Sequence, residues 1–318
     1  MGLAIAYILL SSASFALNQA SVRRGMLRGS ALQGVYSSSV IGVVFLLLAA
    51  AVSAQLFRAG DIVPTGYLML AAAGVNHFIL GRYCNHRAIG AIGANRARVV
   101  EGANAPFSIL LAVALLSEEV TALMWGGIAL VMLGPVIVFR RSSGARAAAS
   151  AAGVAGGSGS GGASPVIAQP TAPPVKYVEG YLFGVLNAAS WSISPLLIRS
   201  ALEDTGLGVL GSLTAYAAST AVLLPLLALP SVRRNLRSAD MSTGRWFVVS
   251  AFSVVTAQMF RYLALSVAPV TIVVPIMRAS SVLLLPVSYL INRRLESFEP
   301  RVILGVLLSI AGSLLVVL

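Results

Sequence analysis

GYLMLAAAGVNHFILGRY (66–83) and RWFVVSAFSVVTAQMFRY (245–262) are two apolar segments of equal length that align from end to end. The alignment places Arg82 on Arg261 and the neighbouring tyrosines on each other. Matches that keep one order and a nearly constant offset indicate an internal duplication. Nearly the same offset gives further matches: Phe15 with Trp191, Asn18 with Ser194, Pro106 with Pro286, Glu118 with Glu296, Gly127 with Gly305 and Gly134 with Gly312.

The composition places the duplicated chain in a membrane. Hydrophobic residues make up 58% of the 318 residues, charged residues make up 10%, and the mean hydropathy is +0.89. Soluble domains carry about 25% charged residues. At about 20 residues for each crossing, the apolar stretches predict an all-α polytopic membrane protein with about ten transmembrane helices. The expected spans are roughly 2–22, 30–53, 66–85, 91–117, 121–139, 179–201, 207–229, 246–266, 270–291 and 302–318.

One long connection divides the ten spans into two groups of five. Residues 140–178 are rich in Ala, Gly, Ser and Pro and have few large apolar side chains, which predicts a flexible linker. The expected units are therefore a first repeat at 1–139 and a second repeat at 179–318. Because five is odd, the second repeat must be inverted in the membrane. Inverted repeats are typical of transporters that bind their substrate near the midplane.

Four short motifs resemble those of the EamA-type transporters of the drug/metabolite transporter superfamily. LLSEEVTALMWGGIALVMLGPVIVF (115–139) is similar to the segment that closes each repeat of this family, and YLINRRLESFEPRVILGVLLSIAGSLLVVL (289–318) is a weaker copy. SFALN (14–18) and SWSIS (190–194) resemble the Trp-x-x-Asn element of the first helix, with Phe15 and Ser194 as departures. The resemblance implies ten helices in two inverted five-helix repeats, a central cavity, and export or exchange of small metabolites.

The basic residues predict an orientation. The net charge is +12, and Lys and Arg resist translocation. Only Arg58 and Arg199 fall on one side of the predicted bundle, so the opposite side should be cytoplasmic and both termini extracytoplasmic. Members of the resembled family are usually drawn the other way. The residues on the basic side are Arg23, Arg24, Arg28, Arg87, Arg140, Arg141, Arg146, Lys176, Arg233, Arg234, Arg237, Arg245, Arg293, Arg294 and Arg301.

The fourth predicted span carries the most polar side chains. Asn95, Arg98 and Glu101 follow one another at intervals of three residues and therefore share one face of a helix. One interpretation is structural, with Arg98 and Glu101 neutralising each other inside the bilayer. The other is functional, with this face lining a cavity in which Glu101 takes up a proton or a substrate amine. Both interpretations stand at this point.

Arg82, Arg261 and Arg278 also lie within predicted spans. Arg278, in the ninth span, falls within one residue of the repeat equivalent of Arg98. In one interpretation the two arginines face one cavity and hold an anionic group such as a carboxylate, and in the other Arg278 snorkels to the membrane surface. Pro275 precedes Arg278 and interrupts the helical hydrogen bonds. Arg82 and Arg261 lie near the ends of their spans, where snorkelling toward the membrane surface is expected.

Other polar and aromatic residues recur at matching depths in the two halves. They line a polar path in one interpretation, and they pack helices through hydrogen bonds or aromatic contacts in the other. His77 alone binds no metal, and His86 is placed in a loop. The single cysteine, Cys84, forms no internal disulfide or cysteine metal cluster, so no cofactor and no metal are predicted. The remaining candidate site residues are Asn18, Trp191, Asn76 and Gln258.

Motif searches exclude most other functions. HExxH, GxSxG and P-loop motifs are absent, and no span holds paired acids, so an enzyme is not expected. The basic loops lack interleaved aromatic residues for nucleic acid and suit anionic lipid headgroups. The leading hypothesis is a secondary active transporter of a small polar metabolite, amino-acid-like or an organic anion, with a homodimer as a compatible assembly. The alternatives are a flippase for a lipid-linked carrier and, with less support, an intramembrane enzyme.

Overall fold

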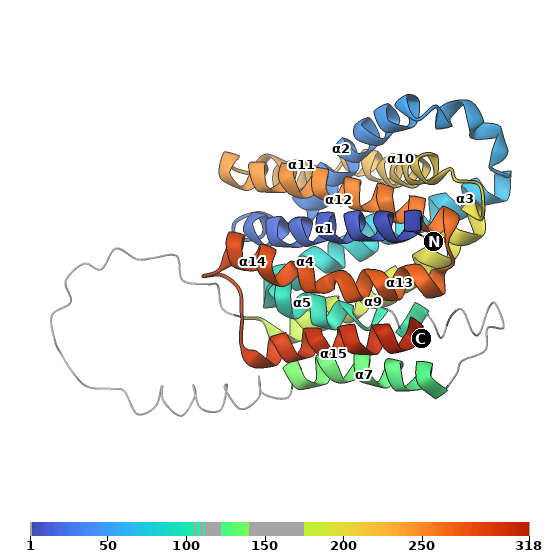
Figure 1. Ribbon diagram of the computed structural model, residues 1–318. Helices are drawn as coiled ribbons and strands as arrows, with labels where there is room; N and C mark the ends of the chain where they lie inside the picture. Colours follow the sequence, from blue (N-terminus) through green and yellow to red (C-terminus); the bar gives the residue numbers. More distant parts are fainter. Residues whose placement is uncertain (1, 105, 109–110, 112–121, 140–174, 318) are drawn as a thin grey trace, which may run out of the picture.

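The computed structural model describes residues 2–104, 106–108, 111, 122–139 and 175–317, and their regular secondary structure is entirely helical. Figure 1 shows long helices running side by side in one bundle. The prediction of an all-α polytopic membrane protein is confirmed. The linker predicted at 140–178 lies outside the described residues up to residue 174, as does Glu118.

The helices of the two halves follow the predicted order. The first half contains α1 (Gly2–Gly25), α2 (Ala31–Val52), the 3-10 helix η1 (Gln55–Asp61), α3 (Pro64–Gly74), the π-helix η2 (Val75–Gly81), α4 (Arg82–Ile92), α5 (Ala94–Glu101) and α7 (Ala122–Phe139). The second half contains α9 (Tyr177–Leu202), α10 (Gly208–Leu226), α11 (Pro230–Arg237), α12 (Met241–Val267), α13 (Val270–Ala279), the 3-10 helix η3 (Ser280–Leu283), α14 (Leu284–Asn292) and α15 (Pro300–Val317).

Several of the described helices have the length and composition of membrane spans. Five meet that test individually, namely α1, α2, α9, α10 and α12. The segment Pro64–Ile92, which comprises α3, η2 and α4, joins η1 at a bend of 118° and adds a sixth, broken span. Large apolar side chains such as Val44 and Leu48 of α2 are exposed on the surface of the bundle, where lipid replaces water as the solvent.

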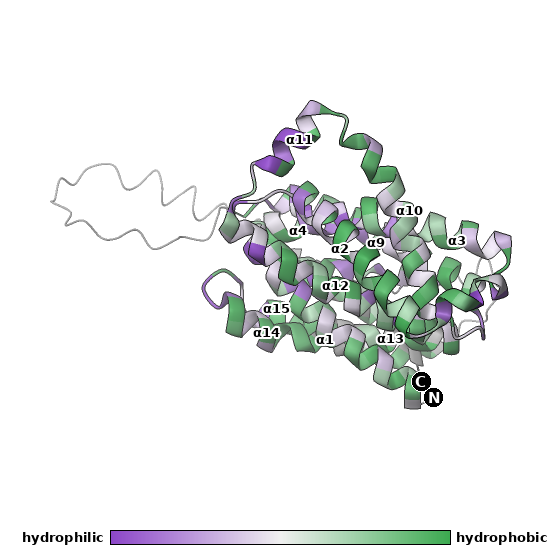
Figure 2. Cartoon of the chain, turned by 90° about the horizontal axis from the view of Figure 1, so that it is seen from above, coloured by the Kyte–Doolittle hydropathy of each residue, from purple (hydrophilic) through white to green (hydrophobic). Residues whose placement is uncertain are grey.

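The two halves pack against each other reciprocally. The first helix of each half lies against the third helix of the other, because α1 contacts α12 while α9 contacts α3, η2 and α4. The second helices, α2 and α10, contact each other, and so do the last helices, α7 and α15. Both termini lie at the same end of the bundle in Figures 1 and 2. This exchange of partners is the packing expected of two inverted repeats.

The structure corrects the predicted boundary between the third and fourth spans. The third helix does not end near residue 85 but continues to Ile92, so that His86 lies buried inside α4 and not in a loop. The break falls at Gly93, whose φ of +88° is a left-handed conformation that glycine adopts without strain. The ring of His86 contacts the carbonyl oxygen of Ala31, with Nδ1 and oxygen 3.4 Å apart, which satisfies a polar group in the bundle interior.

The fourth helix of each repeat is interrupted. The predicted span 91–117 begins as α5, which ends at Glu101, and the predicted span 270–291 is divided by η3 between α13 and α14. These breaks fall at matching positions of the two repeats. Discontinuous helices at matching positions expose backbone polar groups near the midplane, where transporters of this architecture bind their substrates.

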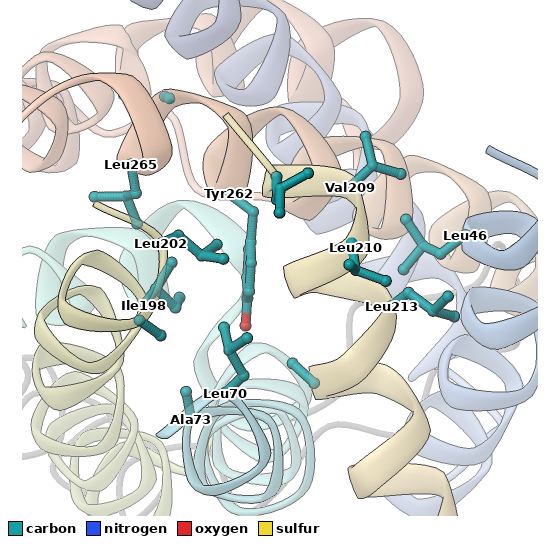
Figure 3. Close-up of a cluster of buried hydrophobic side chains, with 14 of the residues drawn as sticks. Leu46, Leu70, Ala73, Ile198, Leu202, Val209, Leu210, Leu213, Tyr262 and Leu265 are labelled. Atoms are coloured by element: carbon teal, nitrogen blue, oxygen red, sulfur yellow. The ribbon is translucent and has the colours of Figure 1, made fainter. Parts of the chain in front are cut away.

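A large apolar core joins the two halves. Figure 3 shows Tyr262 of α12 surrounded by side chains of α2, α3, α9 and α10. Tyr262 is fully buried, and so are Leu70 and Leu202 beside it. The labelled members of this cluster are Leu46, Leu70, Ala73, Ile198, Leu202, Val209, Leu210, Leu213, Tyr262 and Leu265.

Gly74→Ala is expected to destabilise the protein, because α3 and α10 touch through this glycine. A Cβ atom at Gly74 would lie 2.1 Å from the carbonyl oxygen of Ala215, so the two backbones would have to separate. Overpacking of this kind costs about 1–3 kcal/mol. Gly126→Ala on α7 is the matched control, since its Cβ would meet nothing within 4 Å. In detergent, purified Gly74→Ala should unfold at a clearly lower temperature than the control. Equal unfolding midpoints would contradict the close approach of α3 and α10.

Candidate functional site

A cavity of roughly 400 Å³, counting the part that opens to the outside, lies between the two halves. The first half contributes residues from α1, η2 and α5, and the second half contributes residues from α9, α12 and α13. The wall of the cavity contains both charged and aromatic side chains. The lining residues are Phe15, His77, Arg98, Glu101, Asn104, Trp191, Pro195, Arg261, Val274 and Met277.

Glu101 and Arg98 form an ion pair on the cavity wall. Arg98 Nη1 lies 2.6 Å from Glu101 Oε1, and the Glu101 side chain is 1% exposed. The other carboxylate oxygen accepts a hydrogen bond of 3.0 Å from Gln19 Nε2 and a longer one of 3.5 Å from Asn85 Nδ2. The predicted pair thus exists, and it also lines the cavity. The pairing of the two charges lowers the cost of burying either one.

Arg261 is buried in the cavity wall beside neutral partners. It is 5% exposed, its Nη1 donates a 3.2 Å hydrogen bond to Gln258 Oε1, and the same nitrogen lies 3.2 Å from His77 Nε2. No carboxylate among the described residues forms an ion pair with Arg261, and Glu101 on the same wall attracts it only at longer range. Burying a guanidinium without a directly paired anion is costly. A carboxylate or phosphate bound in the cavity would offset that cost.

The snorkelling predicted for Arg82 and Arg261 is wrong. Arg82 is 2% exposed and lies where η2 runs directly into α4, inside one continuous helix. It donates hydrogen bonds to Ser38 Oγ at 2.7 Å and to the hydroxyl of Tyr216 at 2.9 Å. Its guanidinium also lies over the ring of Phe78. Both arginines therefore find their partners inside the bundle.

His77 connects the two halves at the cavity. Its ring stacks on Trp191 with centroids 4.6 Å apart and planes 9° from parallel. Its Nδ1 lies 3.0 Å from Ser194 Oγ, and its Nε2 lies 2.8 Å from Gln258 Nε2. The Trp191 indole donates a hydrogen bond to the carbonyl oxygen of His77, which is a residue of the π-helix η2. Such π-helical turns are frequent at functional sites.

Two of the predicted site residues, Asn76 and Asn18, lie away from the cavity wall. Asn76 donates to the Ser190 carbonyl oxygen at 2.6 Å and joins η2 to α9. Asn18 accepts a 2.7 Å hydrogen bond from Ser250 Oγ between α1 and α12. Both are interhelical hydrogen-bonding groups, which was the alternative interpretation of these side chains.

Asn95 and Arg278 complete the set of predicted residues. Asn95 Nδ2 donates to the carbonyl oxygen of Ser297 at 3.1 Å, in the connection between α14 and α15. Asn95 thus lies at the end of the bundle, whereas Arg98 and Glu101 reach the cavity. Arg278 belongs to α13 and directly follows Met277, which lines the cavity. The side chain of Arg278 lies outside the described part of the structure.

Several cavity residues were not among the predicted site residues. His77 was weighed as part of a polar path or as an interhelical hydrogen-bonding group and was not selected, and Arg261 was assigned to the membrane surface. The repeat alignment already paired Arg261 with Arg82, and that pairing indicated that the two arginines lie at equivalent, buried positions. Asn104 lies three residues beyond Glu101 on the same face. Among the residues that the structure describes, no group of three His, Cys, Asp or Glu side chains is placed to hold a metal.

Two reciprocal helical halves around a buried, charged cavity define the class of membrane transporters built from inverted repeats. The family model described as the EamA-like transporter family matches residues 2–140 and 178–318. The chain belongs to the EamA-like transporter family, and it is therefore an integral, multi-pass transporter of the drug/metabolite transporter superfamily. The resemblance noted in the sequence is confirmed.

Comparison with curated proteins gives no match. Solved structures do share the fold. One of them, described as "Crystal structure of protein", is 16% identical, with a TM-score of 0.57 over 98% of this chain and 94% of that chain. At this level of identity the likeness concerns the fold alone.

Proposed function

We propose that the protein is a secondary active transporter that carries a small organic anion, or an amino-acid-like zwitterion, through the central cavity. The observation that carries the proposal is the buried Arg261 guanidinium, whose described hydrogen-bond partners are neutral and which forms no ion pair with a described carboxylate, in a cavity that both halves line. An arginine fork binds carboxylates and phosphates with two parallel hydrogen bonds. The anionic group of the substrate would bind there.

The rest of the wall supports a small amphipathic solute. Phe15 and Trp191 supply aromatic surface, and Val274 and Met277 supply aliphatic surface. Glu101 offers the negative charge that an ammonium group of a zwitterion needs. A pocket that is mostly apolar with a few polar groups is typical of small-molecule sites. The absence of a nucleotide-binding motif from the sequence favours a solute or proton gradient as the source of energy.

A ligand panel tests this proposal. The purified protein is heated in detergent with single carboxylates, phosphates, amines and amino acids, each at millimolar concentration. Ligands that bind the folded state raise the unfolding midpoint with concentration. The proposal expects stabilisation by at least one anionic or zwitterionic solute and none by simple amines. Stabilisation by cations or neutral solutes alone would overturn it.

A reporter fused after Leu318 is expected to read extracytoplasmic. Both termini lie at one end of the bundle, and arginines such as Arg24 and Arg293 lie at the ends of α1 and α14 on the other side. Because Lys and Arg are retained in the cytoplasm, the terminal end should face outward. Alkaline phosphatase after Leu318 should be active, whereas the same enzyme inserted after Ala239 should be inactive. The reversed pattern would place the termini inside and contradict the charge argument.

A further inference from the structure

The short helix α11 (Pro230–Arg237) joins α10 to α12 at the end of the bundle opposite the termini. Figure 2 shows it as a largely hydrophilic helix that stands out from the side of the bundle. Its sequence, PSVRRNLR, has a strongly amphipathic pattern with three arginines and no acidic residue. The two faces of this helix have different surroundings.

The inner face fixes α11 to the start of α2. Val232 and Leu236 pack against an apolar cluster that includes Val35 of α2. Asn235 accepts a hydrogen bond of 2.6 Å on its side-chain oxygen from Ser30 Oγ. Its carbonyl oxygen accepts another from Gln33 Nε2, also at 2.6 Å. These contacts hold α11 in a defined place with its other face outward.

The outer face carries the charge. Arg233, Arg234 and Arg237 are exposed, and none forms an ion pair with a described carboxylate. The nearest acid along the chain, Asp240, is already engaged, because it accepts a 2.7 Å hydrogen bond from the Thr243 amide and lies 3.7 Å from Arg28. The positive charge of α11 is therefore not neutralised within the described part of the protein.

The surroundings place this charge at the depth of lipid headgroups. Leu226 and Leu229, at the end of α10 just before α11, are 39% and 48% exposed, as expected of residues that face hydrocarbon. Trp246, near the start of α12, has the guanidinium groups of Arg24 and Arg245 over its ring, 5.7 Å and 5.8 Å from the ring centroid. Tryptophan gathers at the membrane–water interface, and basic residues beside it contact headgroups.

We propose that α11 lies on the membrane surface and binds the headgroups of anionic phospholipids through Arg233, Arg234 and Arg237. The apolar face of α11 packs against the bundle, so its basic outer face is the one that reaches the headgroups. Each basic residue at a negatively charged surface contributes roughly fivefold in affinity. Three arginines together should distinguish anionic from zwitterionic lipid clearly.

Titration of the purified full chain in detergent with phosphatidylglycerol or phosphatidylcholine tests the proposal. The variant Arg233→Gln/Arg234→Gln/Arg237→Gln is compared with Arg293→Gln/Arg294→Gln/Arg301→Gln. The control variant also removes three positive charges, from exposed positions at the same end of the helical bundle. Phosphatidylglycerol should raise the unfolding midpoint of the parent and the control more than phosphatidylcholine does. The α11 variant should need at least tenfold more phosphatidylglycerol for the same rise.

Two results would overturn the proposal. One is a full phosphatidylglycerol response in the α11 variant, which would place the lipid elsewhere. The other is an equal loss in the control, which would show an effect of net charge alone. An α11 variant that unfolds at the parent temperature with phosphatidylcholine excludes misfolding as the cause. If it does not, Arg234→Gln/Arg237→Gln, which leaves the hydrogen bond from Arg233 to Leu227 in place, is compared with Arg293→Gln/Arg294→Gln under the same criteria.

Discussion

Arg261→Gln is expected to weaken ligand binding by roughly 30-fold or more while the protein remains folded. Glutamine keeps hydrogen-bonding groups for His77 and Gln258 but removes the positive charge. Loss of one partner from a buried, hydrogen-bonded charge pair costs about 2–5 kcal/mol in binding. The unliganded protein should lose little stability, because the variant removes a buried charge that forms no ion pair with a described carboxylate.

The measurement is the dissociation constant of an anionic ligand identified by the thermal panel. Arg261→Lys retains the charge but not the two-pronged geometry, so it should fall between the parent and the glutamine variant. Arg58→Gln, an exposed arginine paired with Asp61 at 2.9 Å, is the control and should bind as the parent does. A glutamine variant that binds within about threefold of the parent would remove Arg261 from the site.

Glu101→Gln is expected to have two separable effects. The first is on stability, because the change leaves the Arg98 guanidinium without the carboxylate that lies 2.6 Å away. Breaking a buried pair in this way costs about 3–5 kcal/mol. The double variant Arg98→Gln/Glu101→Gln should recover most of that loss, since neither charge remains.

The second effect of Glu101→Gln is on coupling. We propose that Glu101 takes up and releases a proton as the cavity opens to one side and then to the other, a role that glutamine, which does not ionise, cannot fill. Proton-driven accumulation of substrate should therefore be lost, while exchange of substrate across the membrane continues. The double variant should regain stability without regaining accumulation. Proton-driven accumulation by the single variant at the parent rate would assign Glu101 to charge neutralisation alone.

The fold was predictable because membrane spans and repeats leave local signals. Apolar stretches, the linker composition and the pairing of Arg82 with Arg261 are all visible in one sequence. The end of the third helix was not, because Arg87 and His86 look like loop residues to any window of hydropathy. Their partners are remote in sequence: His86 contacts Ala31, and Arg87 pairs with Glu179. A polar residue is buried when another helix satisfies it.

The site was predictable only in part, for the same reason. Arg98 and Glu101 were identified because they are partners of each other and lie only three residues apart in the sequence. Arg261 and His77 were not, since 184 positions separate them in the sequence. Asn95 shares the face of Glu101 but lies nearly two turns nearer the end of the bundle, where the carbonyl oxygen of Ser297 accepts its hydrogen bond. Helical periodicity gives the face of a residue, whereas its depth relative to a cavity depends on how the helices pack.

Counterflow in proteoliposomes tests directly whether the protein transports a small anionic or zwitterionic solute. Vesicles loaded with an unlabelled anionic or zwitterionic solute from the thermal panel are diluted into a trace of the labelled solute. We expect saturable labelled uptake by the parent protein, loss of that uptake with Arg261→Gln, and retention of it with Arg58→Gln. Absence of counterflow for every stabilising solute, together with protein-dependent movement of a lipid-linked carrier between leaflets, would contradict solute transport and identify a flippase.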